Sequence, residues 1–106
     1  MAAETIGEMQ KKMDEASEQI GKAEALCEGK LTTLKLKSNC MEADGLPIKP
    51  EKAMLIPEST IDLEGKRLIS EFYLEYRQIH EWKHTRARMQ WDFEAKIKAA
   101  MDTAVG

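Results

Sequence analysis

The chain has 106 residues, of which 16 are Lys or Arg, 19 are Asp or Glu and 20 are Leu, Ile, Val or Phe, and its formal net charge is −3. This length fits one domain, and a single valine with two residues each of Phe, Tyr and Trp excludes a β-rich core. Ala, Leu, Glu, Lys and Met dominate instead, which is typical of long helices. No apolar run approaches the about 18 residues of a membrane span, so a transmembrane protein is excluded as well.

Two features of the chain bear on its compartment. The segment 1–5 lacks a basic start followed by an apolar stretch, so we expect no secretory signal. Cys27 and Cys40 stand apart without a C-x-x-C spacing, which is typical of reduced thiols in a cytoplasmic protein. The mildly acidic balance also argues against binding of the whole chain to nucleic acid or to an anionic membrane.

The first predicted helix covers residues from about 5 to 44. Thr5 and Glu8 have the spacing of a capping box, in which the threonine hydroxyl accepts a backbone N–H and the glutamate bonds back to the start of the helix. Apolar or small residues then follow at alternating steps of three and four, the heptad pattern of a coiled-coil seam. They are Ile6, Met9, Met13, Ala16, Ile20, Ala23 and Cys27.

The end of this helix is less regular. We expect a one-residue slip of the seam near Gly29 and a stop at the glycine and proline of residues 44–47. Leucine and lysine alternate over residues 30–37, which also fits a short strand, so this stretch is open between helix and strand. The seam residues expected beyond the slip are Leu31, Leu34 and Met41.

Residues 45–58 hold all three prolines and are predicted to connect the helices without being helical themselves. Their apolar side chains need a place away from water. We expect them to fold back over the ends of the helices, and the alternative is a docking segment for another protein. The residues concerned are Ile48, Met54, Leu55 and Ile56.

The second predicted helix covers residues from about 59 to 104. Ser59 and Asp62 offer its start, and apolar residues recur on one face from Leu68 onward. Two helices of similar length with a compact connection fold back as an antiparallel hairpin. We therefore predict one all-α domain, residues 1–106, built from two long antiparallel helices in a coiled-coil-like helical hairpin.

Polar residues interrupt the apolar line near the middle of the second helix. The segment 77–88 has four basic residues and Glu81 as its one acid, whereas residues 4–28 of the first helix hold seven acids and three lysines. A hairpin counted from its turn sets position 83 opposite about position 20, which brings the two charge groups together. The charges predicted to set this register are Lys83, Arg86, Glu15, Glu18 and Glu24.

The second helix carries more apolar surface than one partner helix covers. Each helix of a hairpin shelters a single seam of the other, so the rest of this face is predicted to meet a second copy, completing a four-helix bundle, or a different protein. The predicted interface residues are Phe72, Tyr76, Ile79, Trp82, Met89, Phe93 and Ile97.

Residues 80–84 match the H-E-x-x-H pattern, in which two histidines one helical turn apart bind zinc and the glutamate activates water. This stretch resembles the motif of zinc metallopeptidases, and Glu81 with His84 resembles the E-x-x-H of ferritin-like di-iron bundles. No third histidine and no predicted sheet accompany the pattern, and Glu81 projects opposite the apolar line. We therefore predict no metal and no other cofactor, with a metal-binding bundle through His80, Glu81 and His84 as the alternative.

Basic and aromatic residues alternate over residues 77–91, as in proteins that grip phosphates and stack on bases. The stretch is short and has an acidic helix as its intramolecular partner, so nucleic-acid binding is kept as a second alternative. No nucleophile–base pair is recognisable, and we predict no catalytic residues and no enzymatic activity. The sequence favours a non-enzymatic helical protein–protein interaction module (an adaptor, assembly factor, small chaperone or structural subunit) that acts as a homodimer or on another protein.

Overall fold

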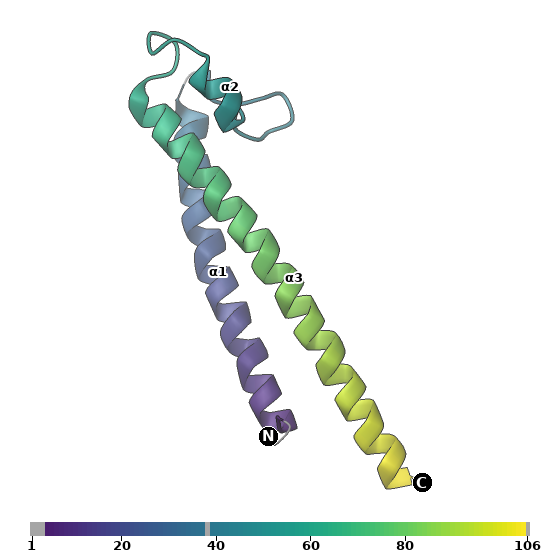
Figure 1. Ribbon diagram of the computed structural model, residues 1–106. Coiled ribbons are helices and arrows are strands. Elements are labelled where there is room, and N and C mark those ends of the chain that lie inside the picture. Colours follow the sequence, from purple (N-terminus) through teal and green to yellow (C-terminus); the bar gives the residue numbers. More distant parts are fainter. Residues whose placement is uncertain (1–3, 38, 106) are drawn as a thin grey trace. The chain divides into compact units, whose positions relative to one another are not determined.

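The computed structural model describes residues 4–37 and 39–105. It contains the helices α1 (Ile6–Leu36), α2 (Pro50–Met54) and α3 (Leu63–Val105), and no strand within the described residues. α1 and α3 run antiparallel and pack against each other (Figure 1), so the predicted all-α helical hairpin is confirmed.

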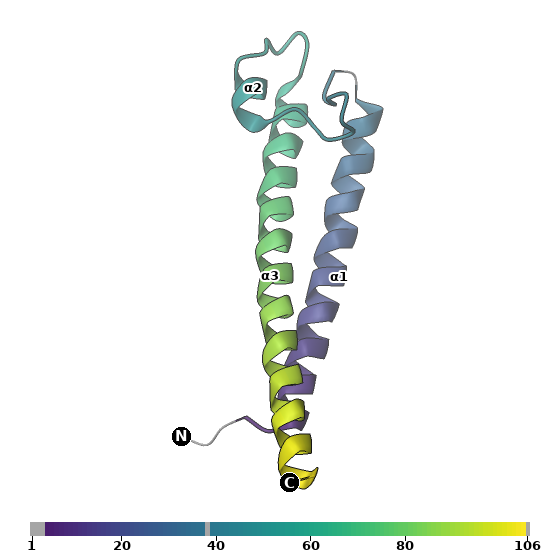
Figure 2. The same ribbon diagram turned by 90° about the vertical axis from the view of Figure 1, so that its right-hand side faces the viewer.

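The chain divides into two units. Unit 1 comprises residues 1–21 and 80–106, and unit 2 comprises residues 22–79. In both units a segment of α1 packs beside a segment of α3. Unit 2 also holds α2 and the loops around it, which lie where α1 ends and α3 begins (Figure 2).

α1 begins behind the predicted cap, since the Thr5 hydroxyl accepts the Glu8 N–H at 3.1 Å. Its most buried residues follow one another at intervals of seven, as the heptad pattern predicts. The expected slip near Gly29 is wrong, because the heptad continues unbroken to the fully buried Leu34 while Leu31 is half-buried beside it. The buried seam residues of α1 are Met13, Ile20, Cys27 and Leu34.

α1 ends at Leu36, earlier than the predicted end near residue 44. Residues 30–36 are helical, so the strand alternative for this stretch is wrong. Asn39 then adopts a left-handed conformation with a φ of 68°, which asparagine tolerates better than most residues and which takes the chain out of the helix.

A pairing beyond the end of α1 explains this early stop. The Ile48 N–H donates to the Cys40 carbonyl oxygen at 2.8 Å, and Met41 forms an isolated β-bridge with Pro47. Cys40 and Ile48 are both buried, so the chain gains more by folding these residues onto the core than by extending the helix into solvent. Gly45, in the loop between them, has a φ of 84°, which glycine adopts without strain.

The connection between the long helices is partly helical, which corrects the prediction for residues 45–58. Pro50 stands in the first turn of α2, where a residue without an N–H loses no hydrogen bond. The predicted folding back is confirmed for Ile48, which is buried, whereas Met54 and Leu55 are 79% and 86% exposed.

Tyr73 of α3 fastens the segment before α2 to the hairpin. Its hydroxyl donates a hydrogen bond to the Pro47 carbonyl oxygen, and the Lys49 ammonium lies 4.5 Å from the centre of its ring. These contacts and the buried Ala53 of α2 hold the segment that connects α1 and α3 against the helices of unit 2.

α3 begins at Leu63 rather than near residue 59, because Asp62 caps it by accepting the Gly65 N–H at 2.8 Å. Gly65 is buried at this start. A Cβ atom on it would lie 2.9 Å from Asp62 Oδ1 and 3.1 Å from Ile61 Cγ2. The first turn of α3 therefore packs closely only with glycine at this position.

The two units differ in how many of their described residues are buried. Unit 1 has the buried residues Met13 and Ile20 on α1, and none of the described α3 residues of this unit is fully buried. Unit 2 has a third layer, since its connecting segments cover the two helices. Besides Pro47 and Gly65, its buried residues are Cys27, Leu34, Cys40, Ile48, Ala53, Ile61, Ile69, Phe72, Tyr73 and Ile79.

Candidate interaction surface

Arg86 reaches across from α3 to α1 within unit 1. Its Nε donates to Ser17 Oγ at 2.9 Å and its Nη1 donates to Gln90 Oε1 at 2.9 Å. This contact fits the predicted register, which sets position 20 opposite position 83. In an antiparallel pair, moving three residues back along α1 to 17 means moving three residues forward along α3 to 86. The group that Arg86 meets is a hydroxyl and not one of the expected carboxylates.

The other predicted register residues lie at the surface. Lys83, Glu15, Glu18 and Glu24 are all exposed. Charges at exposed positions contribute little to stability, about 0–1 kcal/mol for each pair. Their role in setting the register therefore stays a prediction.

Three of the predicted interface residues belong to unit 2. Phe72 and Ile79 are 2% and 7% exposed, so the chain's own core takes them up. Tyr76 stacks on Phe72 with ring centres 5.6 Å apart and is 36% exposed. Phe72 and Ile79 therefore leave little apolar area for a partner, whereas Tyr76 remains partly exposed.

The remaining four predicted interface residues are half-buried on α3 in unit 1. They are Trp82, Met89, Phe93 and Ile97.

A pocket of about 150 Å³ opens beside Met89, between the α1 and α3 segments of unit 1. Met9 of α1 lines it together with Met89, and charged residues line the rest. Glu4 and Lys12 pair at 3.0 Å, and the Lys96 ammonium donates to the Glu4 carbonyl oxygen. The polar lining residues are Glu4, Lys12 and Asp92.

Trp82 extends this apolar surface along α3. It lies seven residues before Met89, so the two side chains leave the helix on the same face. We call Met9, Trp82 and Met89 the methionine face. The sequence pattern predicted Met9 as a seam residue and Trp82 and Met89 as interface residues. It does not predict on which side of the seam a pocket opens.

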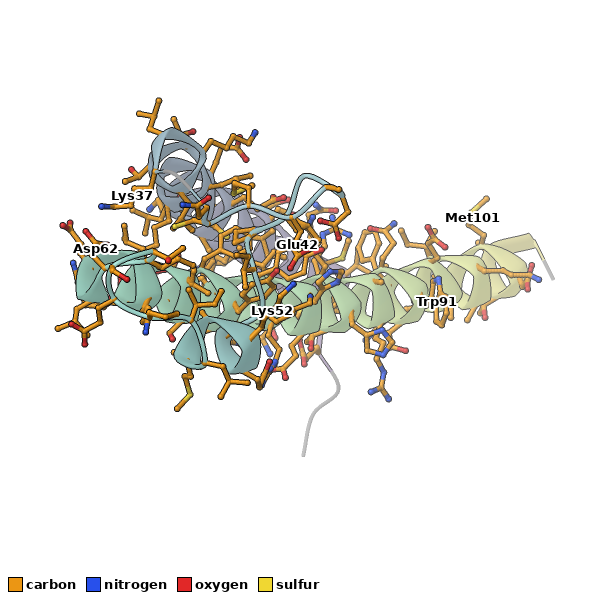
Figure 3. The ribbon with its side chains drawn as sticks, turned by 90° about the horizontal axis from the view of Figure 1, so that it is seen from above. Lys37, Glu42, Lys52, Asp62, Trp91 and Met101 are labelled. Carbon is orange, nitrogen blue, oxygen red and sulfur yellow. The ribbon has the colours of Figure 1, made fainter. Side chains whose placement is uncertain are left out.

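The histidines of the H-E-x-x-H pattern lie on the surface of α3. His80, Glu81 and His84 are all exposed. Among the described residues, no group of three or more His, Cys, Asp or Glu side chains is placed to hold a metal ion. Trp91 and Met101, further along α3 (Figure 3), are 70% and 62% exposed.

A charged pair lies beside the core of unit 2 that the sequence reasoning missed. Lys30 of α1 and Glu75 of α3 form an ion pair with both side chains largely covered. Glu75 Oε2 is buried and, among the described residues, has no hydrogen-bond partner. Burial, with the negative charge of Glu75 second, raises the pKa of the nearby Cys27 thiol. The sequence did hold a signal for this pair, because Lys30 stands one heptad after Ala23 and so occupies a seam position of α1.

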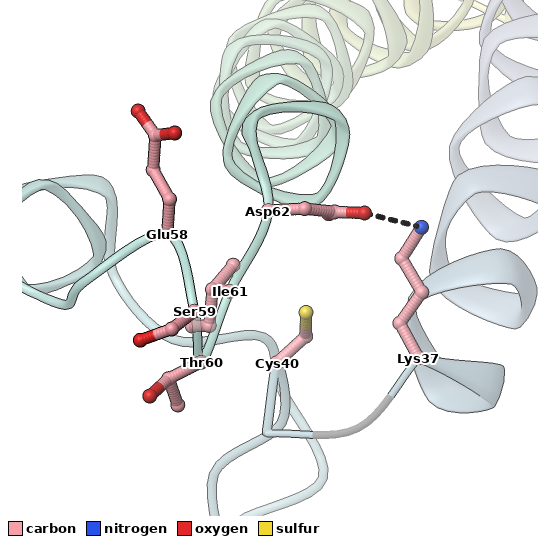
Figure 4. A pocket seen from close by; sticks show the side chains of 7 residues that line it. All are labelled: Lys37, Cys40, Glu58, Ser59, Thr60, Ile61 and Asp62. Atoms are coloured by element: carbon pink, nitrogen blue, oxygen red, sulfur yellow. Dashed lines mark ion pairs between the residues drawn. The ribbon is translucent and has the colours of Figure 1, made fainter.

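A second pocket, of about 310 Å³, lies at the start of α3 in unit 2 (Figure 4). Lys37 and Asp62 pair across one side of it at 3.6 Å. The hydrogen bond from the Gly65 N–H is the first cause that lowers the pKa of Asp62, and Lys37 adds to it. Burial is the first cause that raises the pKa of the Cys40 thiol, with the charge of Lys37 acting in the opposite direction. The lining residues are Lys37, Cys40, Glu58, Ser59, Thr60, Ile61 and Asp62.

No helix in the described part of the chain is both long and apolar enough to cross a membrane. Comparisons with protein-family models, with curated proteins and with solved structures gave no match to this chain. Neither a family nor a relative therefore indicates its function.

Proposed function

We propose that this chain is a non-enzymatic, cytoplasmic protein–protein interaction module that packs a helical partner against the methionine face by coiled-coil-like contacts. The observation that carries the proposal is the pocket between the two helices of unit 1, which has Met9 and Met89 in its lining. Two free thiols favour the cytoplasmic location.

The make-up of this surface supports a protein partner. Interfaces combine an apolar centre with a polar, solvent-accessible rim, as the methionines and the charged residues around them do here. Tryptophan is enriched among the residues that dominate binding energy, and the half-buried Trp82 has area left to bury. Methionine side chains adapt to the shape of an incoming helix.

The thin core of unit 1 gives a reason for binding. Met13 and Ile20 are its buried described residues, and Trp82, Met89 and Phe93 remain half-buried. Covering them with a third helix removes further apolar surface from water, at about 25 cal/mol for each Å².

Site-specific photo-cross-linking in the cells that make the protein tests this proposal. A photoreactive amino acid at position 89 should cross-link to a protein, whereas the same group at the exposed Ala87, on the opposite side of α3, should not. Both variants need wild-type helicity by circular dichroism. Absence of any cross-link from position 89 in a folded chain would contradict the proposal.

A further inference from the structure

One face of α3 in unit 1 is complementary to itself. Its members follow one another at steps of three and four and therefore line up along the helix. We propose that the occupant of the methionine face is a second copy of this chain, with the two α3 helices antiparallel and Met89 at the two-fold axis. This inference rests on the proposed function, because it names the partner of the same surface. The face consists of Trp82, Thr85, Met89, Asp92 and Lys96.

Charge complementarity selects the antiparallel arrangement. Arg88 and Asp92 are exposed, and an antiparallel pair centred on Met89 sets Arg88 of one copy within about 3 Å, along the helix axis, of the level of Asp92 of the other. Two-fold symmetry makes each contact occur twice.

Parallel copies would do the opposite. Arg88 and Asp92 lie on the same flank of the Met89 line, and in a parallel pair this flank of one copy lies on the other side of the interface from that of the second copy. The contacts between Arg88 and Asp92 of different copies would then be lost. The charge order along α3 therefore favours one direction of pairing.

The apolar residues agree with the same centre. Met89 meets Met89 of the second copy and covers the pocket beside Met9. Trp82 falls level with Lys96 of the second copy, whose aliphatic stem suits the face of an indole ring while its ammonium donates to the Glu4 carbonyl oxygen. A partner of another sequence would have to reproduce this order of residues, whereas a second copy has it by symmetry.

Disulfide trapping tests the axis directly. In a Met89→Cys variant the two thiols meet at the two-fold axis, and mild oxidation should give a covalent dimer of twice the 12.0 kDa chain mass. Ala87→Cys, exposed on the opposite side of α3, is the matched control and should stay monomeric on a non-reducing gel. The native Cys27 and Cys40 are buried and should not react.

Charge reversal tests the direction of pairing. Arg88→Asp and Asp92→Arg should each weaken the dimer by about tenfold or more, because each places like charges together twice. An equimolar mixture of the two variants should recover a mixed dimer, since opposite charges then meet at both contacts. Sedimentation velocity over a concentration series measures this, and circular dichroism confirms that both variants keep wild-type helicity.

The outcomes separate this inference from the proposed function. A wild-type chain that stays monomeric, yet cross-links from position 89 to a different protein in cells, overturns the second copy and leaves the interaction module standing. A dimer that traps through position 87, or that ignores both charge reversals, overturns the antiparallel pairing. A monomer without any cross-link from position 89 overturns both proposals.

Discussion

Replacing Gly65 by alanine is expected to destabilise the fold, although the same change in most helices stabilises it by about 1 kcal/mol. The added methyl carbon would lie 2.9 Å from Asp62 Oδ1 and 3.1 Å from Ile61 Cγ2. Displacing Asp62 weakens the cap of α3, which costs about 1 kcal/mol, and pressing on the buried Ile61 costs about 1–3 kcal/mol. We therefore expect Gly65→Ala to lower the free energy of unfolding by a net amount of about 1–3 kcal/mol.

Gly29→Ala is the matched control in the same unit. A Cβ atom on Gly29, inside α1, meets no atom of the described residues within 4 Å apart from its chain neighbours and the backbone of its own helix, so the helical preference of alanine acts alone. This variant should gain about 1 kcal/mol, a rise in Tm of about 4–8 °C for a domain of this size, whereas Gly65→Ala should lower Tm. Urea and thermal denaturation followed by circular dichroism measure both. Equal stabilisation by the two substitutions would refute the close packing at Gly65.

Phe72→Ala should lower the free energy of unfolding by about 3–5 kcal/mol, because Phe72 is 2% exposed, whereas truncation of the half-buried Phe93 should cost about half as much in the same urea titration. The pKa of Asp62 lies below its ordinary value, so its carboxylate stabilises the fold above the unfolded-state pKa and loses this effect as the pH falls through the lower folded-state pKa. Wild type and Asp62→Asn should therefore converge in stability at acid pH, and a constant difference down to the lowest pH would contradict this. Elemental analysis of protein purified without a histidine tag should find no stoichiometric zinc or iron, and bound metal that His84→Ala removes would favour the metal alternative instead.

The hairpin could be predicted because its information is local and repeated. Cys27 and Leu34 stand one heptad apart, and a seam with this period faces a partner helix whatever that partner is. Helices of similar length then leave few ways to pair, so the predicted register agrees with the contact between Ser17 and Arg86. Which hydroxyl or carboxylate Arg86 meets depends on side-chain rotamers, which the period does not encode.

The end of α1 could not be predicted because it depends on residues distant in sequence. Leucine, lysine and methionine favour a helix locally, but the contact between Cys40 and Ile48 outweighs that preference. The same holds for the candidate surface. Periodicity placed Trp82 and Met89 on the apolar side of α3, whereas the pocket beside them depends on where Met9 of α1 sits across the seam.

A comparison of the two units supports the proposal that the methionine face binds a partner. Two helices alone bury one narrow seam, and unit 2 enlarges its core by laying the connection, with Ile48 and Ala53, over the helices. Unit 1 has no such third layer among its described residues, and its α3 side chains stay half-buried or exposed. Burying apolar surface lowers the free energy whichever chain covers it. A docked helix would therefore cover the apolar side chains of unit 1 as the connection covers those of unit 2. In the proposed dimer, α3 of the second copy would be that helix.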